Sequence, residues 1–350
     1  MNKAASSLVF TFLVLSGCSG RQDTRESSVE ITRIPPADKG GPDTLDVIEG
    51  RVEGARPGQR IVLYSRAEVW WAQPESRQPF TEIGADGTWK SPTRLGTEYA
   101  ALLVDPGYVP PASTEALPEM GPGVIAATVV PGDASRKAAH NLLTFSGYEW
   151  LVRAAPSDRG GRNLYAPANA WTDAEGALHL GITGPAPDWT CAEVSLTRRL
   201  GYGTYRFVVR DVSQLEPSVV FSVFTHEGGA VSENFREMGL EISRWGDPLA
   251  TNAQYVVQPY YVPANVARFA APPGPLTHVM QWEPGRVTLR TETDRGPGRR
   301  GRAVAEHVFA TGVPVPGKER IRMNLYVFRR GAQAPTRPAE VVIERFEFLP

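Results

Sequence analysis

Cysteine is scarce in this sequence of 350 residues, which has two, and its 37 basic side chains almost balance its 38 acidic ones. A near-neutral balance gives no reason to expect nucleic acid as a partner. Long stretches with the helical period are also missing, whereas glycine (34) and proline (31) are abundant. This composition favours many strands joined by turns.

The N-terminus has the order of a secretory signal, with Lys3, an uncharged apolar run at 8–15, and then Ser16-Gly17-Cys18. The run is much shorter than the ~20 residues of a membrane-spanning helix, so we expect it to be cleaved. The segment LSGC at 15–18 resembles the lipobox of bacterial lipoproteins. That resemblance implies that Cys18 is acylated and becomes the new N-terminus; an ordinary signal peptide with an incidental cysteine is the alternative.

An acylated Cys18 has consequences for location and for stability. Two or three acyl chains hold a protein stably on a membrane surface. Ser19 follows the cysteine in place of the inner-membrane retention residue Asp. The resemblance therefore implies a lipid-anchored protein of the cell envelope, in the outer membrane, facing the periplasm or the surface. Only Cys191 then remains as a thiol, which excludes an internal disulfide in what we expect to be a monomer.

Shifts in composition predict the organisation of the chain. A polar stretch with few aromatic side chains predicts a flexible tether, and two series of short apolar segments separated by turns predict two β-sandwiches. The expected parts are a signal peptide (1–18), a tether (19–43), an accessory sandwich (44–132), a linker (133–142) and a C-terminal domain (143–350). For the tryptophans at 70, 71 and 89 of the accessory sandwich, a sugar-stacking platform is possible, but we expect at least two of them in the core.

The stretch FREMGLEISRW at 235–245 contains the most informative pattern. Side chains of a strand alternate between its faces, so Glu237, Gly239 and Glu241 share one face while Met238 and Leu240 point into the core. Retaining glycosidases need two carboxylates about 5 to 5.5 Å apart, one as nucleophile and one as general acid/base. Alternating glutamates on a solvated strand are the simpler interpretation.

The C-terminal part resembles glycoside hydrolase family 16, the laminarinase and lichenase family, which has a concanavalin A-like jelly roll. The resemblance covers about residues 143 to 349 and rests on several segments that occur in the family's order: CAEV at 191–194, LGYGTY at 200–205, VVFSVF at 219–224, THVMQWEP at 277–284, NLY at 324–326 and the strand at 341–348. It implies an all-β protein, with a jelly-roll β-sandwich preceded by the smaller accessory sandwich.

The family's catalytic signature is Glu-x-Asp-x-Glu, and the resemblance places Glu237 on the nucleophile and Glu241 on the acid/base. The central Asp is replaced by Gly239. A third carboxylate would shift the pKa values of its neighbours, so its loss removes one influence on Glu241. Two hypotheses follow: a retaining endo-glycosidase acting on β-glucan-type polysaccharide, or a carbohydrate-binding lipoprotein without catalysis. A structural surface protein is a third.

Neighbouring residues suggest substrate contacts. Aromatic rings and amides describe a sugar cleft, with Trp245 as the first candidate, followed by Trp189, Tyr255 and Gln254. Arg244 is expected to pair with a glutamate, or to form only an exposed salt bridge. By resemblance, His278 would orient a catalytic carboxylate, although a lone strand histidine is more often structural.

We expect no cofactor and no transition metal, because the other histidines are scattered without the spacing of metal ligands. Members of the resembled family often bind a structural calcium ion, but no acidic loop in this sequence specifies one. The expected partners are therefore a polysaccharide and, through the lipid anchor, a membrane.

Overall fold

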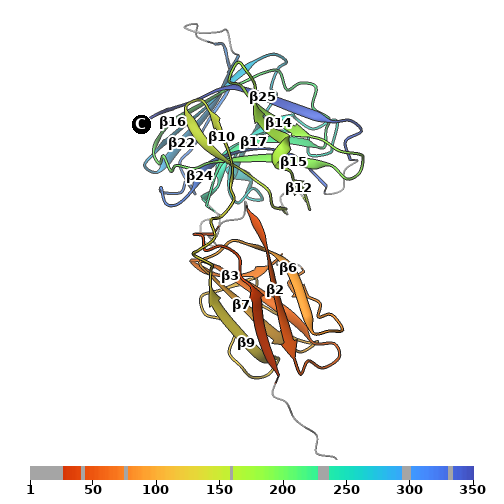
Figure 1. The fold of residues 1–350 in the computed structure, drawn as a ribbon. Coiled ribbons are helices and arrows are strands. Elements are labelled where there is room, and N and C mark those ends of the chain that lie inside the picture. Colours follow the sequence, from red (N-terminus) through yellow and green to blue (C-terminus); the bar gives the residue numbers. More distant parts are fainter. Residues whose placement is uncertain are drawn as a thin grey trace, which may run out of the picture.

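The structure is a computed structural model, and it describes residues 27–40, 44–74, 78–157, 161–227, 236–293, 301–329 and 334–350. The predicted signal peptide and its Cys18 lie outside these residues. Strands account for almost all the regular structure, as Figure 1 shows, so the predicted all-β class is confirmed. Within the described residues, no helix has the length and apolar character needed to cross a membrane.

The strands before residue 132 form two antiparallel sheets (Figure 1). The first has the order β1-β2-β6, and the second β8-β4-β3-β7-β9, with β5 paired to β3. Their bounds are β1 Ser28–Arg33, β2 Leu45–Glu53, β3 Arg60–Ala67, β4 Val69–Gln73, β5 Phe80–Thr81, β6 Thr88–Arg94, β7 Glu98–Val104, β8 Ser113–Thr114 and β9 Val124–Pro131. Trp70 and Trp89 are only 5% and 3% exposed, so two of the three tryptophans are in the core, as predicted.

The prediction of a tether over 19–43 is wrong for residues 28–37. Residues 28–33 form β1, which pairs with β2, and Ile31 on this strand is buried in the hydrophobic core. Farther along, Pro36 forms a bridge with Asp133. The average composition of this stretch is polar, but a short strand needs only two or three apolar side chains at alternate positions to face the core. Composition alone therefore did not reveal β1.

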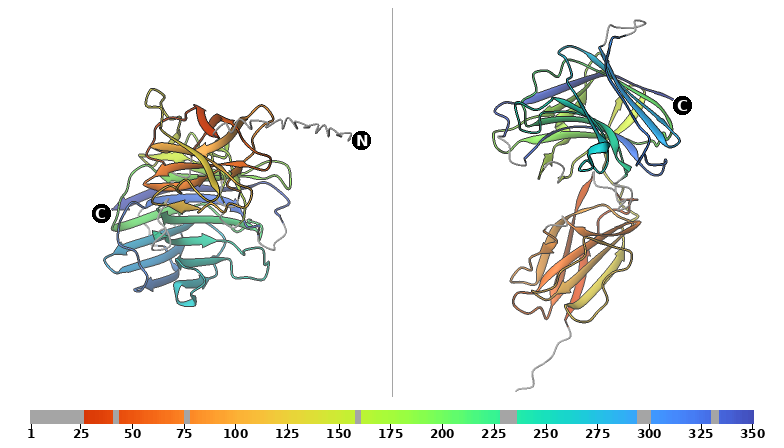
Figure 2. Two further views of the ribbon diagram at one scale, coloured as in Figure 1. Left: turned by 90° about the horizontal axis from the view of Figure 1, so that it is seen from below. Right: turned by 180° about the vertical axis from the view of Figure 1, so that it is seen from behind.

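The remaining strands form a sandwich of two sheets (Figure 1, Figure 2). The nine-stranded sheet has the order β10-β11-β15-β24-β17-β18-β19-β20, with β12 added beside β15, and the seven-stranded sheet the order β13-β14-β25-β16-β21-β22-β23. The nine strands are β10 Asn141–Phe145, β11 Tyr148–Val152, β12 Leu164–Tyr165, β15 Thr190–Leu196, β17 Val219–His226, β18 Met238–Ile242, β19 Ala253–Val257, β20 Val266–Phe269 and β24 Arg320–Val327. The other seven are β13 Ala170–Thr172, β14 Leu178–Ile182, β16 Gly203–Val209, β21 Leu276–Glu283, β22 Arg286–Thr293, β23 Ala303–Phe309 and β25 Ala339–Leu349.

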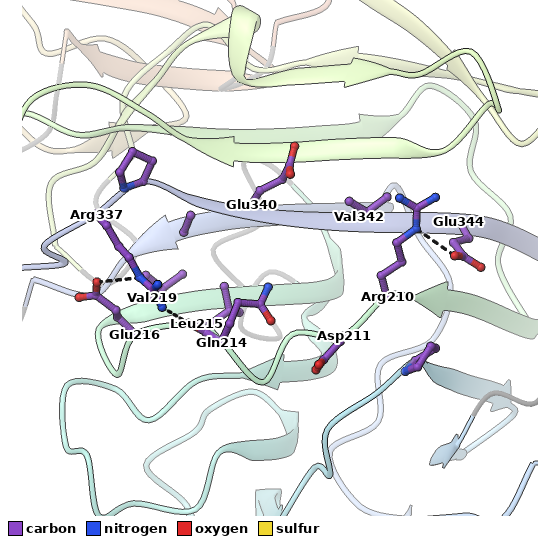
Figure 3. Close-up of a pocket in the computed structure, with 13 residues that line it drawn as sticks. Arg210, Asp211, Gln214, Leu215, Glu216, Val219, Arg337, Glu340, Val342 and Glu344 are labelled. Carbon is purple, nitrogen blue, oxygen red and sulfur yellow. Dashed lines mark hydrogen bonds and ion pairs between the residues drawn. The ribbon is translucent and has the colours of Figure 1, made fainter.

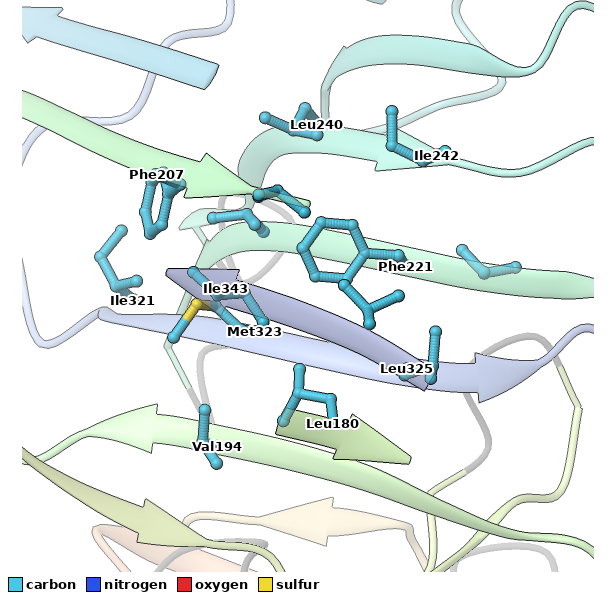
Figure 4. Close-up of a cluster of buried hydrophobic side chains, with 14 of the residues drawn as sticks. Leu180, Val194, Phe207, Phe221, Leu240, Ile242, Ile321, Met323, Leu325 and Ile343 are labelled. Carbon is cyan, nitrogen blue, oxygen red and sulfur yellow. The ribbon is translucent and has the colours of Figure 1, made fainter. Parts of the chain in front are cut away.

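One hydrophobic core fills the space between these two sheets. Figure 4 shows Phe221, Leu240 and Met323 of the nine-stranded sheet interleaved with Phe207 and Ile343 of the other. None of the described core clusters combines residues from before and after the predicted linker. The linker itself is shorter than expected, because β10 begins at Asn141. The other domain limits stay predictions.

Candidate functional site

Strand β18 places its alternate side chains as the sequence predicts. Met238, Leu240 and Ile242 are at most 3% exposed and belong to the core. Glu237, directly before the strand, and Glu241 therefore lie on the opposite side of the nine-stranded sheet, which we call the outer face. The sandwich thus presents both carboxylates on one surface.

Glu237 is almost enclosed, with 5% of its surface exposed. Its Oε2 lies 3.3 Å from Nδ1 of His226, at the end of β17, and its Oε1 accepts a hydrogen bond of 3.1 Å from Nε2 of Gln258. The backbone N–H of Gln258 also donates to the carbonyl oxygen of Glu237, at 2.9 Å. These bonds satisfy a buried carboxylate and hold it in one position.

Glu241 is more accessible than Glu237, being half-buried. Its Oε2 accepts a hydrogen bond of 2.8 Å from Nε2 of Gln254, which lies directly opposite on β19. Gln254 pairs in turn with the exposed Arg268 of β20. The guanidinium of Arg268 lies 5.2 Å from the centre of the Trp245 ring. Glu241, Gln254, Arg268 and Trp245 are thus linked in one connected patch, and their role as substrate contacts stays a prediction.

Gly239, between the two glutamates, has no room for a side chain. A Cβ atom built on it would lie 2.1 Å from the carbonyl oxygen of Val223 and 2.7 Å from the Cα of Phe224. Both belong to β17, where Phe224 pairs directly with Gly239. Glycine in a strand often marks such a close backbone approach. The position therefore has no room for an Asp side chain unless β17 moves.

Three of the predicted substrate contacts are wrong, since the side chains are buried. His278 is fully buried on β21 of the other sheet, and its Nδ1 lies 3.0 Å from Oγ1 of Thr291. The hydroxyl of Tyr255, which is 1% exposed, donates to the same oxygen at 2.7 Å, so both side chains meet inside the core. Trp189 is 3% exposed, and its Nε1 donates to the carbonyl of Pro335 at 3.1 Å.

Arg244 also has a different role from the predicted one. Its guanidinium donates to the carbonyl oxygen of Ala250 and so braces the turn that follows β18. The backbone N–H of Asp247 donates to the carbonyl of Arg244 in the same turn, at 2.9 Å. Among the described residues, the expected ion pair between Arg244 and a glutamate is not formed.

Sequence reasoning missed a buried ionic cluster on the same outer face. Glu193 of β15, 2% exposed, accepts from Nη1 of Arg153 at 3.0 Å and from Nη1 of Arg322 at 2.6 Å through Oε1. Its Oε2 accepts from Nδ2 of Asn324 at 3.1 Å. Arg153 and Arg322 are themselves only 6% and 4% exposed. The polar residues that alternate along β15 and β24 were the available signal, but their partners come from strands far apart in the sequence.

The cluster is aligned with the candidate glutamate pair. Register places Glu193 opposite Asn324, Asn324 opposite Ser222, and Ser222 opposite Glu241. Within the described part of the chain, Oγ of Ser222 and Oδ1 of Asn324 are buried without a hydrogen-bond partner. This half of the outer face is therefore occupied by its own ion pairs, whereas on the side of β19 and β20 the side chain of Arg268 is exposed.

The described residues show no grouping of three or more His, Cys, Asp or Glu side chains suited to a metal ion. The absence of a metal and of a cofactor stays a prediction. Cys191 is a free, buried cysteine, and burial raises the pKa of its thiol to about 11. A thiol of this kind is inert at neutral pH and is no candidate nucleophile.

Comparison with known proteins gives likenesses at the level of the backbone. No protein-family model matches the chain, and no curated protein matches it. Among solved structures, a β-glucanase of Bacillus licheniformis is 16% identical, with a TM-score of 0.45 over 60% of this chain and 96% of that one. A β-1,3-1,4-glucanase (lichenase) from a mouse hindgut metagenome is 18% identical, with a TM-score of 0.43 over 60% and 96%. A protein of Mycobacterium tuberculosis described as a pseudo β-1,3-glucanase is 16% identical, with a TM-score of 0.43 over 57% and 91%. We draw no conclusion about activity from likenesses at this level.

Proposed function

We propose that this protein acts on a β-glucan-type polysaccharide as a retaining endo-glycosidase, with Glu237 as nucleophile and Glu241 as general acid/base. The observation that carries the proposal is the asymmetry of two carboxylates on one face. Glu237 is buried and held by His226 and Gln258, whereas Glu241 is accessible to a leaving group and to water. A fixed, hydrogen-bonded carboxylate suits a nucleophile, and an accessible one suits proton transfer.

In the proposed reaction, a carboxylate oxygen of Glu237 attacks the anomeric carbon and forms a glycosyl ester. The bond to the glycosidic oxygen breaks, and Glu241 gives that oxygen its proton. Glu241 then removes a proton from water, whose oxygen attacks the same carbon and releases Glu237. The retained configuration follows from the two successive displacements.

The test is release of reducing sugar from a panel of soluble β-glucans and galactans. Glu237→Gln and Glu241→Gln should each lower the rate by at least about 100-fold, because each removes a group that takes part in the transition state. Glu306→Gln is the matched control, since this exposed glutamate lies on β23 of the other sheet. Equal release by the parent and both variants would refute the assignment.

A second candidate function is carbohydrate binding without hydrolysis, and Gly239 favours it. The site has no space for a third carboxylate, and the neighbouring ionic cluster closes part of the outer face. Retardation of the parent protein in a gel containing β-glucan, together with no release of reducing sugar, would select this function. Neither retardation nor release would select a structural role.

We also propose that Cys18 carries the lipid that anchors the protein in the outer membrane. The LSGC segment before the polar stretch supports this, and it lies outside the described residues. In cells, the parent should partition into the detergent phase of a Triton X-114 extract and Cys18→Ser into the aqueous phase. Partition of both into the same phase would contradict the anchor.

A further inference from the structure

A second aromatic surface lies on the seven-stranded sheet, on the other side of the core from Glu237 and Glu241. Trp171 belongs to β13, the edge strand of that sheet, and 40% of its surface is exposed. Among the described residues, the exposed large hydrophobic side chains include only two other aromatic ones, Tyr260 and Tyr261, which both follow β19. An exposed indole on a rigid strand is a flat surface of the kind on which sugar rings stack.

One face of the Trp171 ring packs on a side chain of the neighbouring strand. It stacks on His179 of β14, with ring centres 4.9 Å apart and an angle of 15° between the planes. Nε2 of His179 lies 3.0 Å from Asp173, and its Nδ1 lies 2.9 Å from Glu340 on β25. Burial alone would lower the pKa of His179, but these hydrogen bonds raise it. The indole is therefore preorganised and loses little freedom when a ligand binds.

A hollow of about 580 Å³ adjoins this surface through Glu340, and Figure 3 shows the side chains around it. Its charged lining consists of two arginines and four carboxylates: Arg210, Arg337, Asp211, Glu216, Glu340 and Glu344. Both arginines are already paired, Arg210 with Glu344 at 3.0 Å and Arg337 with Glu216 at 3.4 Å. The balance is acidic, so a uronate or sulfate group would be repelled.

We propose that Trp171 and the adjoining hollow form a surface binding site for an uncharged polysaccharide chain. One sugar ring stacks on the exposed face of the indole, and hydroxyl groups of the next donate to the carboxylates of the hollow. This site requires no catalysis, so it stands whether or not Glu237 and Glu241 cut the chain. It would hold the protein on a polymer while the outer face of the other sheet contacts a separate segment.

The experiment is affinity electrophoresis of the full chain in gels containing uncharged β-glucan or its carboxymethylated form. Trp171→Ala should weaken retardation by the uncharged glucan by about tenfold, the effect expected on removing one aromatic contact worth ~1.4 kcal/mol. Trp171→Phe should keep part of the affinity, because a smaller ring remains. Leu249→Ala is the control, since this side chain is 92% exposed and does not line the hollow.

The outcomes separate this site from the glutamate pair. Loss of retardation in Trp171→Ala, with unchanged hydrolysis of a short soluble oligosaccharide and an unchanged midpoint of unfolding, supports the surface site. Glu237→Gln should be retarded like the parent. Equal retardation of the parent and Trp171→Ala would overturn the proposal, as would equal affinity of the parent for both forms of glucan, or for neither.

Discussion

Substitution of Gly239 by alanine tests the close approach of β18 and β17 most directly. The added methyl would lie 2.1 Å from the carbonyl oxygen of Val223, and ordinary contact between such atoms is about 3.5 Å. One strand must therefore move by about 1.4 Å within a packed sheet. Overpacking of this kind destabilises the folded protein by about 1 to 3 kcal/mol. Alanine also lowers the conformational entropy of the unfolded chain, which stabilises the fold by about 0.5 to 1 kcal/mol and offsets part of this cost.

We therefore expect Gly239→Ala to lower the free energy of unfolding by roughly 1 kcal/mol, within a range of about 0 to 2.5 kcal/mol. The measurement is urea unfolding followed by tryptophan fluorescence, comparing midpoints at equal slope. Gly181→Ala is the matched control, because a Cβ on this strand glycine meets only ordinary contacts, the nearest at 3.7 Å. That variant should be as stable as the parent or slightly more so.

The same geometry predicts the result of placing a carboxylate at position 239. Gly239→Asp should be less stable than Gly239→Ala, since its larger side chain meets the same backbone, and it should not raise the release of reducing sugar. A Gly239→Ala variant as stable as Gly181→Ala would refute the close approach. A gain of activity in Gly239→Asp would show that β17 yields and that the missing Asp limits the chemistry.

Three further predictions concern the buried groups. Glu193→Ala should lower the free energy of unfolding by about 3 to 5 kcal/mol in urea, because it leaves Arg153 and Arg322 buried without this carboxylate; a loss below about 1 kcal/mol would contradict the cluster. Cys191 should react with a thiol reagent at pH 8 only after unfolding, because burial raises its pKa to about 11, and rapid labelling of the native protein would contradict its burial. His278 has its pKa lowered to about 4 by burial, so the unfolded chain binds a proton that the fold does not. The contribution of His278 to the free energy of unfolding is complete above about pH 6.5 and falls by about 3 kcal/mol as the pH drops to about 4. If the free energy of unfolding of His278→Phe fell as steeply with decreasing pH as that of the parent, this prediction would be contradicted.

Strand alternation in the sequence determined which side chains of β18 face the core and which share a surface. It needed no knowledge of neighbouring strands, because a period of two follows from the backbone alone. The abundance of glycine and proline and the lack of helical periodicity likewise led to the all-β class. The shared face of Glu237 and Glu241 was therefore predicted from local information.

His278 and Tyr255 show where this reasoning stops. Both neighbours of His278 on β21, Thr277 and Val279, are themselves largely buried, so the pattern of this strand does not reveal which side is the core. Tyr255 alternates with Gln254, and either residue suits a sugar cleft. The side chain that faces outward depends on which sheet covers the strand, and that is a non-local property.

The composition of the polar stretch before residue 44 predicts a tether. Strand β1 nevertheless forms there, because it pairs with β2 and buries Ile31 in the core. The cluster around Glu193 joins β15, β24 and Arg153, which directly follows β11, and these strands are brought together only by their order in the sheet. By itself, the sequence determined the class of fold and the shared face of Glu237 and Glu241. Only the tertiary structure decided which aromatic rings reach solvent and that Gly239 leaves no room for a third carboxylate, because both depend on strand pairing and sheet packing between distant segments.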